Sequence, residues 1–158
     1  MANDLSIRDR IAGNPFFAGL APEFIDVLAA NARIRQLERD HVLFHYGERA
    51  DHFHVIVSGR ISVEVAAIEG PPLELQSLEA GAVLGWSWLL PPYTWTFQAR
   101  AAEDTVVIEF DGKTIRERCE ANPAFGYELL KRFSALMSER LLFARQKMME
   151  EWRPSGYA

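Results

Sequence analysis

The histidine pair His52 and His54 is the part of this sequence whose residue types and spacing best suit a metal ion. Because alternate residues of a β-strand point to the same face, one strand would present both imidazoles to the same ion. His41 and His45 precede the pair on another expected strand, and no histidine follows it. The alternative is that the rings face solvent or form ordinary hydrogen bonds. We keep His52 and His54 as candidate ligands but expect no bound metal.

Two other side chains, those of Ser87 and Cys119, could act as nucleophiles if a neighbouring base activated them. The sequence around them shows no recognisable base and orienting group, and it has no glycine-rich phosphate loop of the P-loop kind. Cys119 is the only cysteine, so it cannot form an internal disulfide, and its surroundings favour a small apolar residue on a short helix. We expect no enzymatic activity.

Helices are expected at both ends of the chain. Near the start, Pro15 and Pro22 suit first-turn positions, and Asn14 can accept hydrogen bonds from free amides. Near the end, Asp111 is a good N-cap for a short helix, and a long helix is expected to follow it as far as Trp152.

The middle of the chain, from about residue 33 to residue 110, is a β region. Apolar residues alternate there or form short β-branched runs between Gly, Pro, Asp and Glu. Short strands at such close spacing favour an antiparallel arrangement over a parallel sheet with crossover helices. We predict a mainly β fold with flanking helices, an antiparallel β roll of the jelly-roll type. The expected strands span residues 34–37, 42–46, 52–57, 60–65, 73–78, 95–100 and 106–110.

The composition is that of one globular domain. The chain has 158 residues, of which 49% are hydrophobic and 25% charged, so it can bury a core without disulfides. Its net charge of -5 argues against a dedicated nucleic-acid binder, which normally carries a basic excess. No signal peptide or bilayer-spanning apolar run is seen, so we expect a cytoplasmic protein that does not contact membranes. We assign residues 1–152 to a single domain and residues 153–158 to a flexible tail.

Three stretches of the sequence follow one another in the order of a known family. They are "LFHYGERADHFHVIVSGRISV", "LEAGAVLGWSWL" and "ARAAEDTVVIEF". Together they resemble the cyclic-nucleotide-binding domain of the catabolite-activator and FNR (Crp/Fnr) class of regulators. The resemblance covers roughly residues 16–142 and implies the same β roll. The matching positions are Gly47, Ala50, Phe53, Val55, Ser58, Gly59, Gly81, Gly85 and residues 99–104.

The sequence departs from this family in the turn that would hold the cyclic phosphate. Family members place a glutamate just after the glycine equivalent to Gly85 and an arginine before the final strand, whereas this chain has Trp86 and then Trp95 or Thr96. A phosphate buried without its cation costs on the order of several kcal/mol. Arg100, the only guanidinium nearby, should point away from this turn because strand neighbours alternate. We therefore expect that cyclic AMP is not bound in the ordinary way and that no cofactor is present.

The segment from Gly85 to Ala101, "GWSWLLPPYTWTFQARA", holds three of the four tryptophans and only one charged side chain. Two interpretations remain open. The rings fill the former pocket, or they line a retained pocket for a flat or apolar effector, with Ser87 and Thr96 as polar contacts. Under the second interpretation the candidate ligand-binding residues are Gly85, Trp86, Ser87, Trp88, Trp95 and Thr96.

The long C-terminal helix carries a broad apolar arc. At about 100° per residue, its apolar side chains spread over roughly half of the circumference, interrupted by Arg140 and Lys147. The arc is wider than one core contact requires, so we predict a homodimer through this helix; the alternative is one edge buried entirely within the monomer. No helix-turn-helix follows the helix, so no direct DNA binding is expected. The residues predicted to face the second copy are Leu130, Phe133, Met137, Leu141, Ala144 and Met148.

These observations predict a non-enzymatic regulatory or sensory module that responds to a small-molecule effector other than cyclic AMP or to a partner protein. One alternative is a genuine receptor for cyclic AMP or cyclic GMP. The other is a cupin-like metal-binding protein, although Ser58 and Gly59 stand where a cupin would place the glutamate of its first motif.

Overall fold

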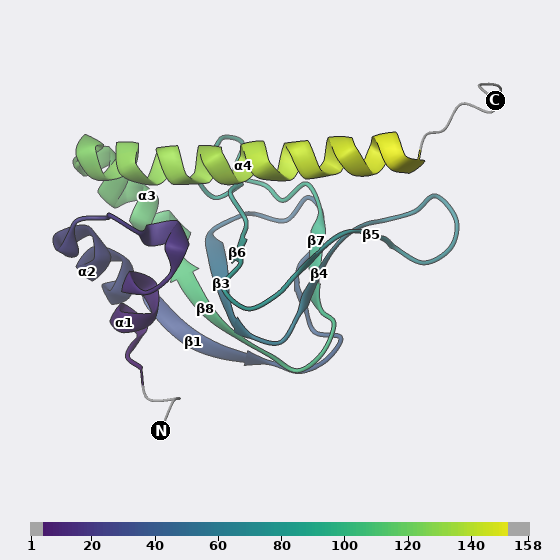
Figure 1. Cartoon of the computed structure of the whole chain (residues 1–158), viewed down its shortest axis with the longest axis horizontal. Coiled ribbons are helices and arrows are strands. Elements are labelled where there is room, and N and C mark those ends of the chain that lie inside the picture. Colours follow the sequence, from purple (N-terminus) through teal and green to yellow (C-terminus); the bar gives the residue numbers. More distant parts are fainter. Residues whose placement is uncertain (1–4, 152–158) are drawn as a thin grey trace.

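The computed structural model of the chain describes residues 5–151 and contains a β roll of two four-stranded antiparallel sheets. The first sheet has the strand order β1-β8-β3-β6, and the second has the order β2-β7-β4-β5. Three helices gather at one side of the roll, and the long helix α4 runs across it (Figure 1). This architecture confirms the predicted mainly β fold with flanking helices. The strands are β1 Ala32–Leu37, β2 Val42–Phe44, β3 His52–Ser58, β4 Ile61–Val65, β5 Leu73–Leu78, β6 Val83–Leu84, β7 Gln98–Ala101 and β8 Thr105–Asp111.

The main difference from the predicted strands lies just before β7. A strand was expected from residue 95, but the ladder begins only at Gln98. Residues 85–97 form turns and bends around an isolated bridge between Arg49 and Thr94. The strand β6 is absent from the predicted set, because an element of two residues carries no readable periodicity.

Capping side chains begin the helices as the sequence predicts. The Asn14 side chain accepts a hydrogen bond from the Phe16 amide at 2.9 Å and donates one to the Gly81 carbonyl at 3.0 Å. The Asp111 side chain accepts from the Thr114 amide at 3.1 Å. These contacts satisfy amides that the first turn of a helix leaves free. The helices are α1 Ile7–Ala12, the 3-10 turn η1 Pro15–Phe17, α2 Pro22–Ala30, α3 Gly112–Ala121 and α4 Pro123–Glu151.

A cluster of phenylalanines joins the helices to the roll. Phe53 of β3 and Phe110 of β8 are register partners whose rings stack with centroids 4.4 Å apart. Phe17 of η1 and Phe133 of α4 pack against this pair. Each of the four residues is at most 1% exposed, and complete burial of such a ring stabilises the fold by about 1.5–3 kcal/mol. The cluster therefore anchors the first half of α4 to the roll.

The position of Phe133 corrects one sequence prediction. This residue was expected on a face that meets a second copy, but its ring is fully buried within the monomer and cannot make that contact. By contrast, Leu141 and Met148 in the second half of α4 are 72% and 63% exposed. The expected tail, residues 153–158, and Trp152 lie outside the described residues. Within residues 5–151, no helix combines the length and the apolar character needed to cross a membrane.

Candidate functional site: a cavity under the long helix

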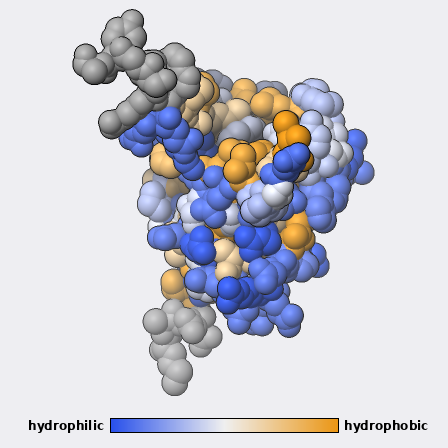
Figure 2. All heavy atoms as spheres, turned by 90° about the vertical axis from the view of Figure 1, so that its right-hand side faces the viewer, coloured by the Kyte–Doolittle hydropathy of each residue, from blue (hydrophilic) through white to orange (hydrophobic). Residues whose placement is uncertain are grey.

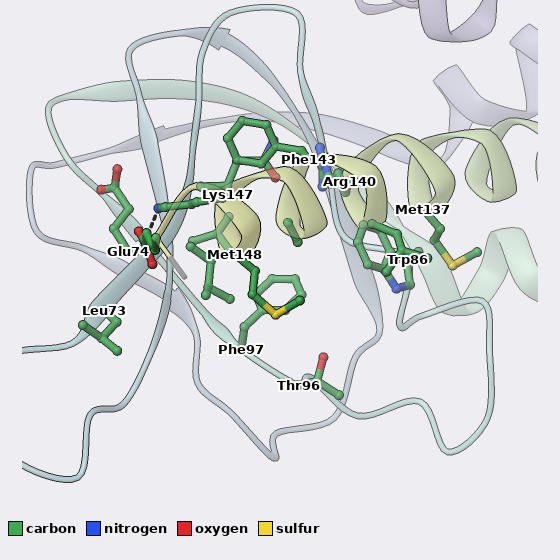
Figure 3. Close-up of a pocket in the computed structure, with 16 residues that line it drawn as sticks. Leu73, Glu74, Trp86, Thr96, Phe97, Met137, Arg140, Phe143, Lys147 and Met148 are labelled. Atoms are coloured by element: carbon green, nitrogen blue, oxygen red, sulfur yellow. Dashed lines mark hydrogen bonds between the residues drawn. The ribbon is translucent and has the colours of Figure 1, made fainter. Parts of the chain in front are cut away.

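A cavity of about 700 Å³ lies between the second sheet and the C-terminal half of α4. Strands β4 and β5 form one wall, the segment 96–97 with Trp86 forms another, and α4 closes a third side from Met137 onwards (Figure 3). Its volume and mainly apolar lining are those of small-molecule sites. The apolar lining residues are Val63, Leu73, Leu75, Trp86, Phe97, Met137, Leu141, Phe143, Ala144 and Met148.

The apolar lining continues onto the molecular surface beside β5 and the end of α4. Figure 2 shows apolar side chains gathered on this face and surrounded by hydrophilic ones. Leu73 and Leu75 of β5 are both exposed although they line the cavity. A ligand could therefore enter from this side without displacing the core.

Trp88 does not belong to the cavity, which corrects its predicted role as a ligand contact. Its ring is fully buried, stacks on Phe53 with centroids 4.7 Å apart and meets the edge of Phe133. Its indole N–H donates to the Gly85 carbonyl at 3.2 Å. A buried ring with its polar atom satisfied is a structural residue.

Trp95 and Gly85 are likewise structural and do not line the cavity. The Trp95 ring is buried and stacks on Phe44 at a centroid distance of 3.7 Å. It also lies over Gly85, where an added β-carbon would come within 2.6 Å of the ring. Ser87 is buried too and is not among the lining residues.

Trp86 and Thr96 are the two residues of the predicted set that line the cavity. Trp86 is half-buried, and the guanidinium of Arg140 lies 5.5 Å from the centre of its ring. Thr96 is exposed at the cavity wall. The six predicted residues thus divide into two at the cavity and four in the structure that supports it.

Arg140 of α4 is the cationic residue that sequence analysis did not assign to the site. It interrupts the apolar arc of the helix because its side chain reaches into the cavity wall, where it donates a hydrogen bond to the Val83 carbonyl. Burial lowers the pKa of Arg140 to about 10, so it still carries its charge at neutral pH. About two helical turns further on, Lys147 lines the cavity as well and donates to the Glu74 carbonyl at 3.3 Å.

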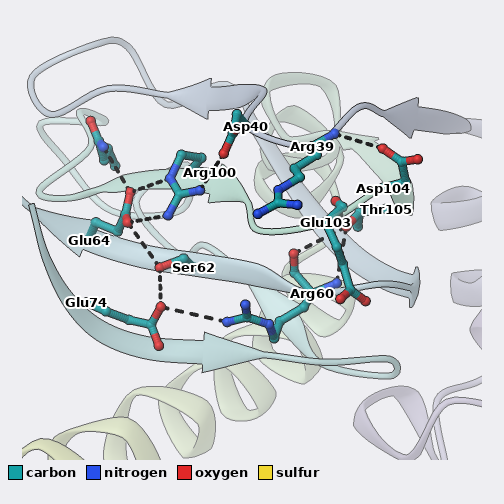
Figure 4. Close-up of polar contacts among 11 residues, drawn as sticks. Arg39, Asp40, Arg60, Ser62, Glu64, Glu74, Arg100, Glu103, Asp104 and Thr105 are labelled. Atoms are coloured by element: carbon teal, nitrogen blue, oxygen red, sulfur yellow. Dashed lines mark hydrogen bonds and ion pairs between the residues drawn. The ribbon is translucent and has the colours of Figure 1, made fainter.

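Arg100 points away from the cavity, as its place on a strand predicts. Its neighbours Ala99 and Ala101 are fully buried, whereas its guanidinium binds Glu64 at 2.9 Å and Asp40 at 2.9 Å on the outer face of the second sheet (Figure 4). The hydrogen bond from Arg100 lowers the pKa of the Glu64 carboxyl. This arginine is therefore engaged in an ion-pair network and is not directed at a ligand.

The histidine pair is separated by its environment. His52 is exposed, whereas His54 is buried with its Nε2 3.0 Å from a carboxylate oxygen of Glu109. Glu109 also accepts hydrogen bonds from Arg33 and Arg35. No group of three or more metal-ligating side chains occurs in the part of the chain that the structure describes. The two histidines therefore have different surroundings and do not act together. The partner of His54, Glu109, lies on another strand, so the sequence did not reveal it.

Cys119 has no nucleophilic character in this fold. It packs against the hydrophobic core, and burial raises the pKa of its thiol to about 11. The thiol therefore stays protonated at neutral pH, and a protonated thiol is a poor nucleophile.

Comparison with known proteins places this geometry in one family. The family model "Cyclic nucleotide-binding domain" matches residues 34–122. The chain is 34% identical over 96 residues to Acetyltransferase Pat of Mycolicibacterium smegmatis, a match that spans 61% of this chain and 28% of that protein. It is similar to a solved structure from Geobacter metallireducens described as a cyclic nucleotide-binding protein, with a TM-score of 0.75, 27% identity, and coverage of 86% of this chain and 97% of that one.

A regulator of known class shares the fold. The catabolite activator protein of Thermus thermophilus has a TM-score of 0.68 at 23% identity, over 85% of this chain and 61% of that one. The family model covers more than half of the chain, from β1 to the end of α3, and so includes both sheets. The chain therefore belongs to the cyclic nucleotide-binding domain family and has the fold of its Crp/Fnr-type members.

Proposed function

We propose that this chain is a non-enzymatic regulatory module that binds a small molecule other than cyclic AMP in the cavity under α4. The observation that carries the proposal is the division of the aromatic side chains. Trp88 and Trp95 pack into the core, while Trp86 and Phe97 line a cavity of about 700 Å³. The rings shape a site and do not plug it.

The chemistry of the lining supports a ligand other than a cyclic nucleotide. A ribose cyclic phosphate and a purine base together require several polar partners, since each buried polar group must be hydrogen-bonded. The turn from Gly85 to Thr96 supplies no acidic or basic side chain, and Arg100 is held outside by Glu64. Apolar side chains predominate elsewhere in the lining, and its two cations, Arg140 and Lys147, lie on α4 and not in the turn. A mainly apolar ligand fits these walls better.

The helix α4 would carry the signal because it serves two surfaces. The seam of α4, exposed at every member except the half-buried Met137, consists of residues whose spacings of 7, 4, 3 and 4 follow the a/d pattern of a coiled coil. We propose that this seam pairs with a second copy of the chain. All members of the seam except Leu130 also line the cavity. A ligand that binds one position of α4 more tightly than another would therefore change how the two copies of the chain pair. The seam residues are Leu130, Met137, Leu141, Ala144 and Met148.

Calorimetric titration with octanol, a neutral apolar probe, and with cyclic AMP tests the site. Leu75→Trp adds bulk to the β5 wall of the cavity and changes no residue of α4, and Ile68→Trp adds the same ring to a fully exposed position before β5. We expect octanol to bind the wild type and Ile68→Trp but not Leu75→Trp, and cyclic AMP to bind none of them. Cyclic AMP binding that Leu75→Trp abolishes would support the receptor alternative and overturn the proposal.

A further inference from the structure

Arg140 is a charged side chain set into the wall of an apolar cavity. Its guanidinium lies 5.5 Å from the centre of the Trp86 ring and donates a hydrogen bond to the Val83 carbonyl. The ring and the carbonyl hold the group in one place, close to the turn that joins β6 to the aromatic segment (Figure 3). A guanidinium has five N–H donors, so this contact leaves most of its hydrogen-bonding capacity unused.

The only carboxylate whose charge is found to act on this cation among the described residues is that of the adjacent Glu139, and it raises the pKa of Arg140 by less than burial lowers it. Among residues 5–151, Arg140 forms no ion pair, whereas Arg33, Arg35, Arg100 and Arg132 all do. A partly buried charge without a counter-ion is costly, and the lowered pKa of Arg140 reflects that cost. An anion in the cavity would remove the penalty.

Two acidic side chains, Glu74 and Glu151, line the cavity, and within residues 5–151 neither forms an ion pair with Arg140. Glu74 lines the cavity, but its carboxylate accepts a hydrogen bond from Ser62 at 2.6 Å and pairs with Arg60 at 3.8 Å (Figure 4). Ser62 in turn lies beside Glu64, within the ion-pair network of the outer face. Glu74 is therefore not available to neutralise Arg140.

The charges and the apolar walls together define the ligand class. Building on the proposed function, we propose that the cavity binds an amphipathic organic anion, whose charged group pairs with Arg140. The apolar body would lie against Phe97, Met137 and Met148, which line the same cavity. Planar guanidinium groups bind carboxylates through two parallel hydrogen bonds, so a carboxylate is the fitting head group.

Titration with three probes that share one alkyl chain tests the charge preference in the wild-type protein. Octanoate, octanol and octylamine carry a negative, a neutral and a positive head group. We expect octanoate to bind most tightly and octylamine most weakly. Octylamine binding as tightly as octanoate would overturn the inference without any substitution.

Two arginine variants on the same helix locate the effect. Arg140→Gln keeps a hydrogen-bond donor for Val83 but removes the charge, and it should weaken octanoate by about 10- to 100-fold while leaving octanol unchanged. The control Arg145→Gln, at an exposed position outside the lining, should leave both affinities unchanged. Arg140→Lys should recover part of the octanoate affinity, because it restores the charge but not the planar fork.

The outcomes separate this inference from the proposed function. If octanoate and octanol bind equally and Arg140→Gln alters neither, while Leu75→Trp blocks both, the ligand class is wrong and the cavity remains a binding site. If neither probe binds the wild type, both proposals fail. A loss of octanol affinity in Arg140→Gln equal to the loss of octanoate affinity would also overturn the ligand class, because it would show that Arg140 only supports the wall.

Discussion

Gly85 is held by two separate constraints, one from the backbone and one from packing. Its φ of +98° lies in the region that a β-carbon disfavours, and the Trp95 ring occupies the space where that carbon would sit. The glycine thus lets the chain turn out of β6 while the ring covers the turn. The buried Trp95 can stack on Phe44 only because residue 85 has no β-carbon in the space that the ring fills.

Gly85→Ala should therefore destabilise the fold more than a backbone effect alone. Gly81→Ala is the matched control, since Gly81 has a φ of +89° but nothing within 4 Å of an added β-carbon. We expect a loss of about 1–2 kcal/mol for Gly81→Ala from the backbone, and a further loss of about 1–3 kcal/mol for Gly85→Ala from overpacking. Urea unfolding followed by circular dichroism measures both, and equal losses would contradict the packing assigned to Trp95.

The two tryptophans on either side of Ser87 should respond differently to truncation. Trp88→Ala removes a fully buried ring and should lower the free energy of unfolding by about 3–5 kcal/mol. Trp86→Ala removes a half-buried ring from the cavity wall and should cost less than about 1.5 kcal/mol, while it weakens octanol binding. The same unfolding experiment, with calorimetry for the ligand, compares the variants. A larger loss of stability for Trp86→Ala than for Trp88→Ala would contradict the assignment of Trp88 to the core and Trp86 to the cavity wall.

Which tryptophan is buried could not be predicted from the sequence, because residues 85–97 follow no regular period. In a strand or helix the period fixes the direction of each side chain. In this turn the irregular backbone fixes it, and the sequence does not encode that path in a readable pattern. Arg100 shows the opposite case, since it lies on a strand and its outward direction follows from alternation.

At the scale of elements, α4 changes its surroundings along its length. Its first half packs Phe125, Leu129 and Phe133 into the core, and its second half covers the cavity and leaves its seam exposed. The sequence predicts the helix and the breadth of its apolar arc. It does not tell where the helix passes from the core to the cavity, and for that reason Phe133 was assigned to the wrong surface.

Pairing through the seam of α4 can be tested without any ligand. Leu130 belongs to the seam, is 43% exposed and does not line the cavity. If two copies pair through this seam, Leu130→Glu places a charge at a coiled-coil core position and should convert the dimer to a monomer. Sedimentation velocity over a range of protein concentrations measures the change.

The control for this change is Ala135→Glu, which adds the same charge at an exposed position on another side of α4. It should leave the association state and the affinity for octanol as in the wild type. A wild-type chain that sediments as a monomer at all concentrations would contradict pairing through the seam.

At the scale of the whole molecule, one cluster centred on the buried Glu109 ties three strands of the first sheet together. Glu109 of β8 binds Arg33 and Arg35 of β1 on one side and His54 of β3 on the other. These partners are 55 to 76 residues away from Glu109 in the sequence, so only the sheet register brings them together. Sequence patterns predict the strands and the roll, but this register was not deduced, and the cluster was missed with it.

The protonation states in the cluster follow from burial and pairing. Burial lowers the pKa of His54, and this effect outweighs the hydrogen bond to Glu109, which raises it. Burial would raise the pKa of Glu109, but hydrogen bonds from His54, Arg35 and Arg33 outweigh that effect and hold the pKa well below its ordinary value. A neutral His54 with its proton on Nε2 donates to Glu109 and leaves Nδ1, which has no partner, without a proton to satisfy.

Acid should therefore destabilise the protein in two steps. Below pH 6.5, the ordinary His value, the unfolded chain binds a proton on His54 that the folded state resists, so the free energy of unfolding falls as the pH falls. Below pH 4.5 the ionised Glu109 adds a second loss with the same sign. The slope contributed by one proton cannot exceed about 1.4 kcal/mol per pH unit. Urea unfolding at a series of pH values from above 6.5 to well below 4.5, with the slope taken separately in the two pH ranges, measures the dependence.

His54→Gln isolates the first step, because glutamine can still donate to Glu109 but does not titrate. This variant should lose part of the slope between pH 6.5 and the lower folded pKa of His54, and keep the slope below pH 4.5. His52→Gln, the same change at the exposed member of the pair, is the control and should keep both slopes. If His54→Gln retained the full wild-type slope below pH 6.5, the first step would belong to another group, and the buried histidine would not be the neutral donor that joins β3 to β8.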